Sequence, residues 1–133
     1  MGQFANDLNK FTKKTETVAS EVCRKIALDT FRRIVQRSPV DTGRFRANNQ
    51  ISLNELPVNS VLEFDKRGAA TIRIGDQTVQ RFKLGDTIFI YNNVAYALPL
   101  EYGRSKQAPQ GVYRISFQDM IAHLKKIARE AVK

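Results

Sequence analysis

The stretch Ala95-Tyr-Ala-Leu-Pro-Leu-Glu-Tyr-Gly-Arg-Ser-Lys-Gln-Ala-Pro-Gln-Gly111 lies between a strongly apolar segment and a C-terminal amphipathic pattern. Its prolines and glycines restrict or widen the available backbone angles, which is not typical of a generic linker. Its larger apolar residues alternate as on an extended segment with one face on a core. These residues are Tyr96, Leu98, Leu100 and Tyr102. We therefore predict an ordered loop over 92–111 with its even-numbered side buried.

Helical periodicity is present at both ends of the chain. Apolar residues recur at helical spacing over 4–37, which indicates either one long helix or two helices separated near residues 14–16, and we expect one. The Ser38-Pro39 step should end it, because proline disfavours helical angles in the residue before it. After Ser116 the apolar positions again follow one helical face, so we predict an amphipathic helix over 112–132.

The middle of the chain has the shorter period of strands. Residues 45–53 alternate between apolar and polar, residues 61–64 and 70–74 flank a hairpin-like turn, and residues 87–91 are apolar on both faces. Gly75-Asp76 is a further turn signal. These patterns predict an antiparallel sheet of about four strands within residues 45–91. The expected fold is therefore α+β, with residues 1–133 as a single domain.

Length and composition limit the classes of protein. A chain of 133 residues with 42% hydrophobic residues is long enough for one domain with a real core. The single Cys23 excludes an internal disulfide, and no apolar run approaches the roughly 20 residues of a membrane span. The N-terminal residues do not resemble a signal peptide. We expect a protein without a cofactor that works in the cytoplasm of the cell that makes it.

The charge is strongly positive. Twenty-two Lys and Arg against 13 Asp and Glu give a formal charge of +9, which points to nucleic acid as a partner. The cations are scattered along the chain, however. Such a spread is typical of a solvated surface whose ion pairs add little to stability. It would also suit a protein that stands beside packaged DNA or an acidic subunit.

Asp41-Thr42-Gly43 is the strongest enzymatic motif, because Asp-Thr-Gly is the active-site triplet of aspartic proteases, whose two aspartates share a proton across a dimer. Here the triplet follows a predicted helix end and Pro39, and Arg44 would keep the aspartate ionised. His123 is the only histidine and has no metal ligand at suitable spacing. We predict a turn, no metal site and no enzyme. A protease dimer remains an alternative.

Two segments together resemble the tail-completion and head–tail joining proteins of long-tailed bacteriophages, including the minor tail protein Z type. The first is Ser38-Pro-Val-Asp-Thr-Gly-Arg-Phe-Arg-Ala-Asn48. The second is Ile90-Tyr-Asn-Asn-Val-Ala-Tyr-Ala-Leu-Pro-Leu-Glu-Tyr-Gly-Arg-Ser-Lys-Gln-Ala-Pro-Gln-Gly111. They occur in the same order as in that group, between a long helix and an amphipathic helix, and cover about half the chain.

The resemblance implies a small α+β subunit that forms a ring, most simply a hexamer, at the head-proximal end of a phage tail. Such a ring would contact the tail tube protein on one side and the head connector or neck proteins on the other. DNA would pass through its lumen without sequence specificity. The protein would then be found in the virion, after assembly in the host cytoplasm, with no membrane partner.

This interpretation assigns site residues to two surfaces. Gly43 and Gly103 are expected to supply backbone angles that other residues avoid, and Glu101 is expected to meet an arginine of the same or the next subunit. The candidate subunit or neck interface comprises Asp41, Thr42, Gly43, Arg44, Tyr96, Glu101, Tyr102, Gly103, Arg104, Lys106 and Gln107. The candidate lumen residues are Arg46 and Arg73. The alternative function is a small basic DNA-binding protein acting as a free dimer.

Overall fold

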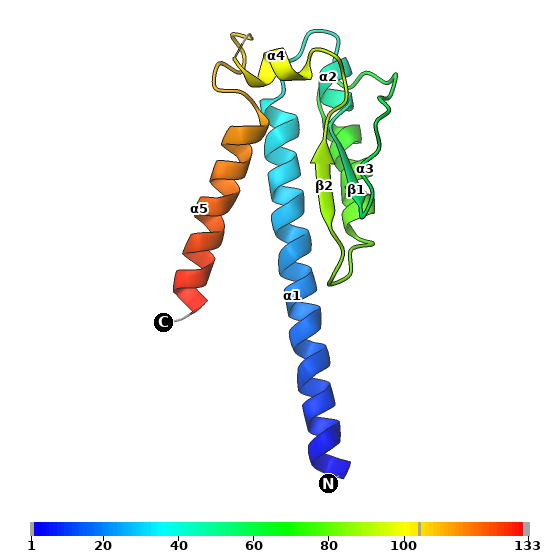
Figure 1. The fold of residues 1–133 in the computed structure, drawn as a ribbon, viewed down its shortest axis with the longest axis vertical. Coiled ribbons are helices and arrows are strands. Elements are labelled where there is room, and N and C mark those ends of the chain that lie inside the picture. The colour runs from blue at the N-terminus through cyan, green and yellow to red at the C-terminus, as the bar shows by residue number, and fades with distance from the viewer. Residues whose placement is uncertain (1, 104, 132–133) are drawn as a thin grey trace.

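The structure is a computed structural model that describes residues 2–103 and 105–131 (Figure 1). It is an α+β fold in which a long N-terminal helix, a small antiparallel sheet and a C-terminal helix are joined by short helices and loops. The elements are α1 (Gly2–Arg37), α2 (Arg44–Ala47), β1 (Gln50–Leu53), α3 (Ala69–Val79), β2 (Ile88–Tyr91), α4 (Ala97–Glu101) and α5 (Tyr113–Ala131).

Helix α1 is continuous over its 36 residues, which confirms the prediction of one long N-terminal helix. At 1.5 Å per residue it is about 54 Å long. Its C-terminal half lies inside the body of the protein, and its N-terminal half projects away from it (Figure 1). The helix ends at Arg37, where the backbone N–H of Ser38 still donates to the carbonyl of Ile34 (3.0 Å) before Pro39.

The C-terminal half of α1 separates two apolar clusters, one on each side. The first cluster packs α1 against the sheet and α3, and its buried members are Ala27, Phe31, Val35, Ile51 and Val79. The second packs α1 against α2, the loops and the start of α5, and its buried members are Ile34, Phe45, Val94, Ala108 and Val112. The long helix is thus the central element of the core.

The sheet has two strands in the described residues, so the prediction of about four strands was wrong. Strands β1 and β2 are antiparallel, with Ile51 opposite Ile90 and Ser52 opposite Phe89. Ile51 and Ile90 face the first cluster. Residues 45–47, predicted as part of the first strand, belong to the helical turn α2, because Gly43 enters it at φ +91° and its carbonyl accepts the N–H of Ala47 (3.0 Å).

Helix α3 replaces the strand predicted over residues 70–74. Asp65 caps the chain before it: Oδ1 accepts the N–H of Gly68 (2.9 Å), and Oδ2 accepts the N–H and the hydroxyl of Thr71 (2.9 and 2.7 Å). Desolvation alone would raise the pKa of the Asp65 carboxyl, but these hydrogen bonds outweigh it and hold the pKa below its ordinary value. The residues between Val61 and Phe64 form no strand.

Gly75 lies inside α3, not in the turn predicted there. It is buried on the same helical face as Thr71 and Val79. A side chain at this position would collide with the ring of Phe31 on α1. Glycine is therefore required here for the close approach of the two helices, and its presence is no sign that the helix ends.

The segment around Pro99 is the short helix α4 and not an extended strand. Proline is tolerated in a first helical turn, because the N–H it lacks would have no intrahelical partner there. The helical turn leaves Tyr96 40% and Tyr102 77% exposed, so the expectation that the even-numbered side is buried was wrong for both tyrosines. Leu100 does pack against the second cluster.

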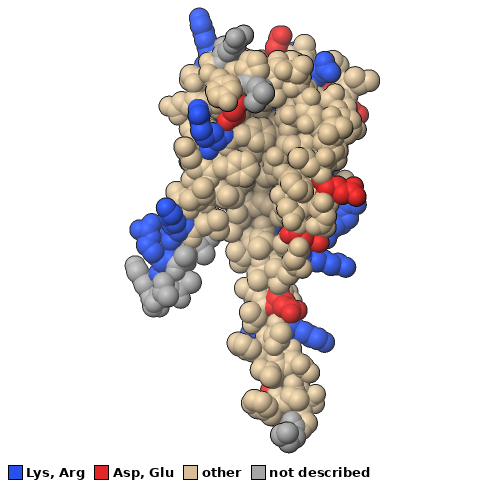
Figure 2. Space-filling model, in the orientation of Figure 1, with Lys and Arg blue, Asp and Glu red and all other residues tan. Residues whose placement is uncertain are grey.

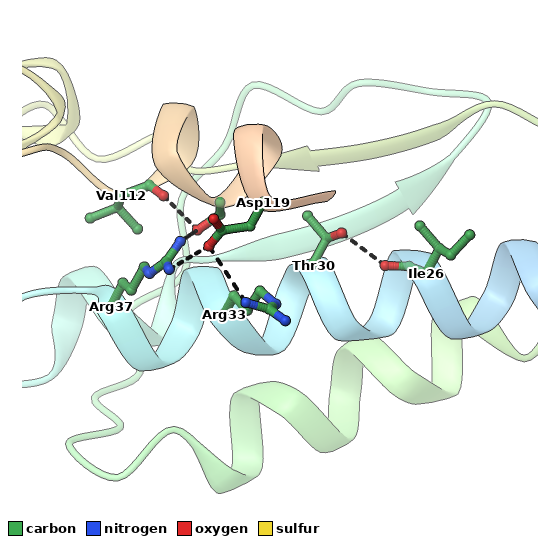
Figure 3. A network of polar contacts seen from close by, with 7 residues as sticks. Ile26, Thr30, Arg33, Arg37, Val112 and Asp119 are labelled. Carbon is green, nitrogen blue, oxygen red and sulfur yellow. Dashed lines mark hydrogen bonds and ion pairs between the residues drawn. The ribbon is translucent and has the colours of Figure 1, made fainter. Parts of the chain in front are cut away.

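Helix α5 confirms the predicted C-terminal helix and is attached to α1 at its first turns (Figure 3). The guanidinium of Arg37 contacts the Asp119 carboxylate (2.5 Å) and the Ser116 hydroxyl (3.2 Å). Arg33 lies 3.5 Å from the same carboxylate. The Ser116 hydroxyl donates to the carbonyl of Val112 (2.7 Å), so both helices share one polar contact network. Beyond it the two helices diverge (Figure 1).

Candidate functional site

The two segments that carry the phage resemblance line the same hollow. Its volume is about 590 Å³, and it lies between the turn after α1 and the loops around α4. The lining residues are Pro39, Val40, Asp41, Thr42, Gly43, Arg44, Phe45, Phe64, Tyr96, Leu100, Ser105 and Gln107. Six residues predicted for the interface are therefore brought together at one place: Asp41, Thr42, Gly43, Arg44, Tyr96 and Gln107.

Gly43 fixes the conformation of the turn after α1, which lines one side of the hollow. Its φ of +91° confirms that this glycine adopts an angle unfavourable for other residues. A Cβ atom there would lie 2.7 Å from the backbone nitrogen of Lys66 and 2.8 Å from that of Asp65. The Gly43 carbonyl accepts the N–H of Asp65 (2.9 Å), and the Thr42 hydroxyl accepts the N–H of Arg44 (3.3 Å), as expected for a capped turn.

Gln107 connects the loop after α4 to the turn after α1. Its side-chain amide pairs with the backbone of Val40: Oε1 accepts the Val40 N–H (2.9 Å) and Nε2 donates to the Val40 carbonyl (3.1 Å). The Gln107 N–H in turn donates to the Ser105 hydroxyl (3.1 Å). A glutamine that satisfies both backbone groups of another residue acts like a strand partner, so it fixes the second loop against the first.

Glu101 caps α5 and contacts no arginine side chain among the described residues. Its Oε2 accepts the N–H groups of Val112 (2.9 Å) and Tyr113 (2.8 Å), and its Oε1 accepts that of Arg114 (2.7 Å). A carboxylate at a helix N-terminus both satisfies free N–H groups and complements the helix dipole. Among the described residues, the partners of the Glu101 carboxylate are thus three backbone amides at the start of α5.

The loop between α4 and α5 folds back tightly on Glu101. Gly111 has a φ of +84°, and a side chain there would collide with the carbonyl of Glu101. Gly103 has a φ of +85°, which confirms the angle expected for it, and a side chain there would collide with the carbonyl of Pro109. Both glycines allow the close backbone approach that aims the Glu101 carboxylate at α5.

Buried asparagines form a hydrogen-bond network that connects the segments around the hollow. Asn49 is 2% exposed; its Nδ2 donates to the Ser38 hydroxyl (2.7 Å), and its Oδ1 accepts from the Tyr113 hydroxyl (2.7 Å) and from Asn92 (3.2 Å). It therefore connects the end of α1, the sheet and α5. Burial, the negative charge of Glu101 and Tyr91 together raise the pKa of the Tyr113 phenol well above its ordinary value, so the hydroxyl stays a donor.

Asn48 makes a second connection of the same kind. It is 0% exposed, donates to the carbonyls of Arg44 (2.8 Å) and Val61 (3.0 Å), and accepts the N–H of Val61 (2.7 Å). Neither Asn48 nor Asn49 was predicted as part of the site. A signal was available, because the Asn48-Asn49 and Asn92-Asn93 pairs adjoin the two strand ends that the sheet register brings together.

Arg46 serves the fold internally. Its guanidinium donates to the carbonyls of Lys66 (2.7 Å), Ser38 (2.8 Å) and Gln36 (3.2 Å), which include groups at the C-terminal end of α1. Desolvation lowers the pKa of this guanidinium, while the charge of Asp65 opposes the shift. These bonds occupy both terminal nitrogens and give Arg46 a capping role at the end of α1, whereas its lumen-facing position stays a prediction.

The other predicted site residues lie apart from the hollow's interior. Arg73 is exposed on α3, on another side of the body, and borders a shallow depression with Arg32 and Asp76. Tyr102 and Lys106 are exposed on the loop after α4. Arg104 lies outside the described residues. Among the residues that the structure describes, no group of three or more His, Cys, Asp or Glu side chains is arranged to hold a metal ion.

The hollow combines an apolar floor with a charged rim. Phe45 is buried at its base with Leu100 beside it, and the Tyr96 ring lies 6.0 Å from that of Phe45. Asp41 and Arg44 supply opposite charges around this floor. Such an arrangement suits an apolar side chain carried by a neighbouring polypeptide, with polar groups of that chain at the rim.

Comparisons of the chain with family models, curated proteins and solved structures found no match. No helix among the described residues is long and apolar enough to cross a membrane.

Proposed function

We propose that this protein is a structural virion protein of a long-tailed bacteriophage. It forms a ring, most simply a hexamer, at the head-proximal end of the tail, where it completes or terminates the tail and joins it to the head. The proposal starts from the resemblance of two sequence segments to tail-completion and head–tail joining proteins. It assigns no catalysis to the chain.

One observation carries the proposal: the two segments, separated by more than forty residues, line one hollow of about 590 Å³. Hydrogen bonds between the Gln107 side chain and the Val40 backbone join them. Segments that resembled a family by chance would have no reason to meet. Their joint surface has the apolar floor and charged rim of a protein–protein contact. We infer that it receives a segment of the next subunit or of a neck protein.

Exposed apolar side chains on the loop beside the hollow also support an assembly. Val58 is 92% exposed, Leu62 80%, Phe64 63% and Leu56 55%. Phe64 belongs to both this loop and the hollow. Several large apolar side chains exposed on one loop favour an interaction surface there.

The positive charge supports the passage of DNA through a ring, since cations along a lumen attract phosphate and carboxylates would repel it. Arg46 is engaged by backbone carbonyls, so Arg73, exposed on α3 near Arg32, is the better candidate for a lumen-facing residue. Substitution of Arg73 should then alter DNA passage or packaging without changing assembly.

Electron microscopy of lysates from a phage or prophage lacking only this gene tests the proposal. Full heads lying apart from tails would support a position at the neck. Overlong tails would then identify a terminator, and tails of regular length would identify a completion or joining factor. Normal, intact particles would contradict the proposal.

A matched pair of substitutions tests the site itself. Glu101→Ala removes the cap of α5 and loosens the loop that forms one wall of the hollow, whereas Lys66 is exposed. We expect Glu101→Ala to reduce plaque formation more than Lys66→Ala. Equal tolerance of the two substitutions would remove the assignment of this loop to assembly.

The second candidate function is a small DNA-binding protein that acts as a free dimer. The formal charge of +9 and the shared depression of Arg32 and Arg73 favour it. It requires sub-micromolar binding to duplex DNA with a steep salt dependence. A gel shift with no binding near physiological salt would exclude it.

A further inference from the structure

Residues 4–22 of α1 carry a line of apolar side chains, interrupted only by Thr15, which we call the seam. Its positions are separated by four, three, four, three and four residues, the spacing of two-helix coiled coils. The seam comprises Phe4, Leu8, Phe11, Thr15, Val18 and Val22. The body of the protein does not use it: Phe4 is 72% exposed, Phe11 68% and Leu8 52%. Figure 1 shows this half of α1 standing free of every other element.

This projecting segment is a poor helix when it stands alone. Thr12, Thr15 and Thr17 have low helix propensity, and each hydroxyl donates to a carbonyl one turn earlier (3.0, 3.0 and 2.9 Å), a bond that does not strengthen a helix. Isolated helices of this length are marginal in water even with better sequences. A packed partner along the seam would supply the missing stabilisation.

The balanced charges on the segment favour a second copy of this chain as that partner. Lys10, Lys13 and Lys14 are balanced by Asp7, Glu16 and Glu21, so the formal charges of residues 2–22 cancel while the whole chain carries +9. Figure 2 shows isolated charges of both signs on this half of α1. Two such helices can lie together without net repulsion, and a nucleic acid would gain little from the contact.

The residues that flank the seam decide the direction of pairing. One flank has the small residues Ala5, Thr12 and Ala19, and the other has Asp7, Lys14 and Glu21. In a parallel pair each charged flank lies against the small flank of its partner. In a fully overlapping antiparallel pair the charged flanks would meet, with Asp7 against Glu21 and Lys14 against Lys14.

We propose that the seam binds the seam of a second copy as a parallel, in-register helix pair. Each seam residue then packs against its own counterpart, and no like charges are in contact. The inference concerns the chain by itself and holds whether or not the assembled protein is a phage ring. Because each seam binds its own counterpart, this contact is isologous and closes at two copies, so it is distinct from the contact that would join neighbours around a ring.

Sedimentation equilibrium of the full chain over a range of concentrations tests the pairing. The wild type should exceed the monomer mass of 15.1 kDa as concentration rises. Leu8→Glu with Val18→Glu should shift the apparent Kd at least tenfold towards monomer. The control, Asn6→Glu with Asn9→Glu, makes the same charge change off the seam on the same helix and should behave as the wild type.

Two measurements make the result decisive. The denaturant midpoint at low protein concentration should be the same for all three proteins, because the seam lies outside the core. The helical content should rise with concentration in the wild type and in the control variant only. A wild-type monomer at every concentration, or equal weakening by both double variants, would overturn the pairing.

Cysteine cross-linking in a Cys23→Ser background tests the direction. Leu8→Cys alone should form a disulfide-linked dimer under mild oxidation, because a parallel register places residue 8 against residue 8. An antiparallel pair with full overlap would instead place residue 8 against residue 18. Cross-linking only in a mixture of Leu8→Cys and Val18→Cys chains would therefore overturn the parallel arrangement.

Discussion

The two halves of α1 belong to one continuous helix and have opposite environments: Phe31 in the C-terminal half is 0% exposed, and Phe11 in the N-terminal half is 68% exposed. Around Phe31 the helix contacts the sheet and α3 on one side and the loops and α5 on the other. Around Phe11 it contacts nothing else in the described part of the chain. Apolar residues at the same helical spacing are thus buried in the core in the C-terminal half and exposed in the N-terminal half.

Periodicity therefore identifies the apolar face of a helix but not the element that covers it. The C-terminal half obtains its stability from its own chain. The N-terminal half, with the same kinds of apolar residue, has none of that support and depends on a partner. Substituting the same residue type in both halves separates the two sources of stability.

The largest expected difference is between the phenylalanines. Phe31→Ala should lower the free energy of unfolding by about 3–5 kcal/mol, because it opens a cavity between α1 and α3. Phe11→Ala should change it by less than about 0.5 kcal/mol at low protein concentration, since the side chain is exposed there. Urea unfolding followed by circular dichroism measures both. A comparable loss from the two substitutions would mean that the projecting half contributes to the folding of the body.

The next comparison is between two asparagines. Asn49→Ala leaves the Tyr113 hydroxyl without its acceptor and removes one of the two acceptors of the Asn92 amide, which keeps its bond to the Phe45 carbonyl. We expect a loss of about 1–3 kcal/mol. Asn9→Ala, on the exposed surface of α1, should be nearly neutral. The same unfolding experiment distinguishes them, and a neutral Asn49→Ala would show that the buried network adds little to stability.

The long helices were predictable because their signal is local and repeats over many turns. The α3 segment was not: its Thr71, Ile72 and Ile74 favour a strand locally, but the Asp65 cap and the contact of Gly75 with Phe31 make it a helix. That contact joins residues distant in sequence, so no local pattern reveals it. The strand count failed for the same reason.

Six of the residues predicted for the interface line the hollow, but their contacts were not predictable. The angles of Gly43 and Gly103 followed from turn chemistry, whereas the partners of Glu101 depend on how the following loop folds back. A carboxylate near arginines in sequence suggests an ion pair, and nothing local indicates that the free N–H groups of α5 compete for it. The asparagine network likewise depends on strand register.

A smaller effect is expected for the glutamates. Glu101→Ala removes the acceptor of three N–H groups at the start of α5 and should cost about 0.5–2 kcal/mol, the usual range for a lost helix cap. Glu16→Ala on the projecting half should be close to neutral. Loss of amide hydrogen-exchange protection confined to the first turn of α5 would identify the cap as the cause. Unchanged protection there would contradict this role.

The smallest effect concerns pH and compares two aspartates. The folded-state pKa of Asp65 lies below its ordinary value, so Asp65 adds stability that is fully present above about pH 4 and is lost as the pH falls through the folded pKa. Asp65→Asn should therefore lower the urea midpoint at pH 7 and approach the wild type once the pH falls below the folded-state pKa. Asp7→Asn, whose carboxylate accepts one exposed hydrogen bond from Gln3, should follow the wild type throughout.

Some acid dependence should remain in Asp65→Asn, because a hydrogen bond from Asn54 also lowers the pKa of Asp86. The expected result is therefore a shallower midpoint–pH curve and not a flat one. Parallel curves for Asp65→Asn and the wild type would mean that the cap holds α3 equally well with a protonated carboxyl. In that case α3 would be helical because Gly75 packs on Phe31, and the charge of Asp65 at the N-terminus of α3 would not be needed.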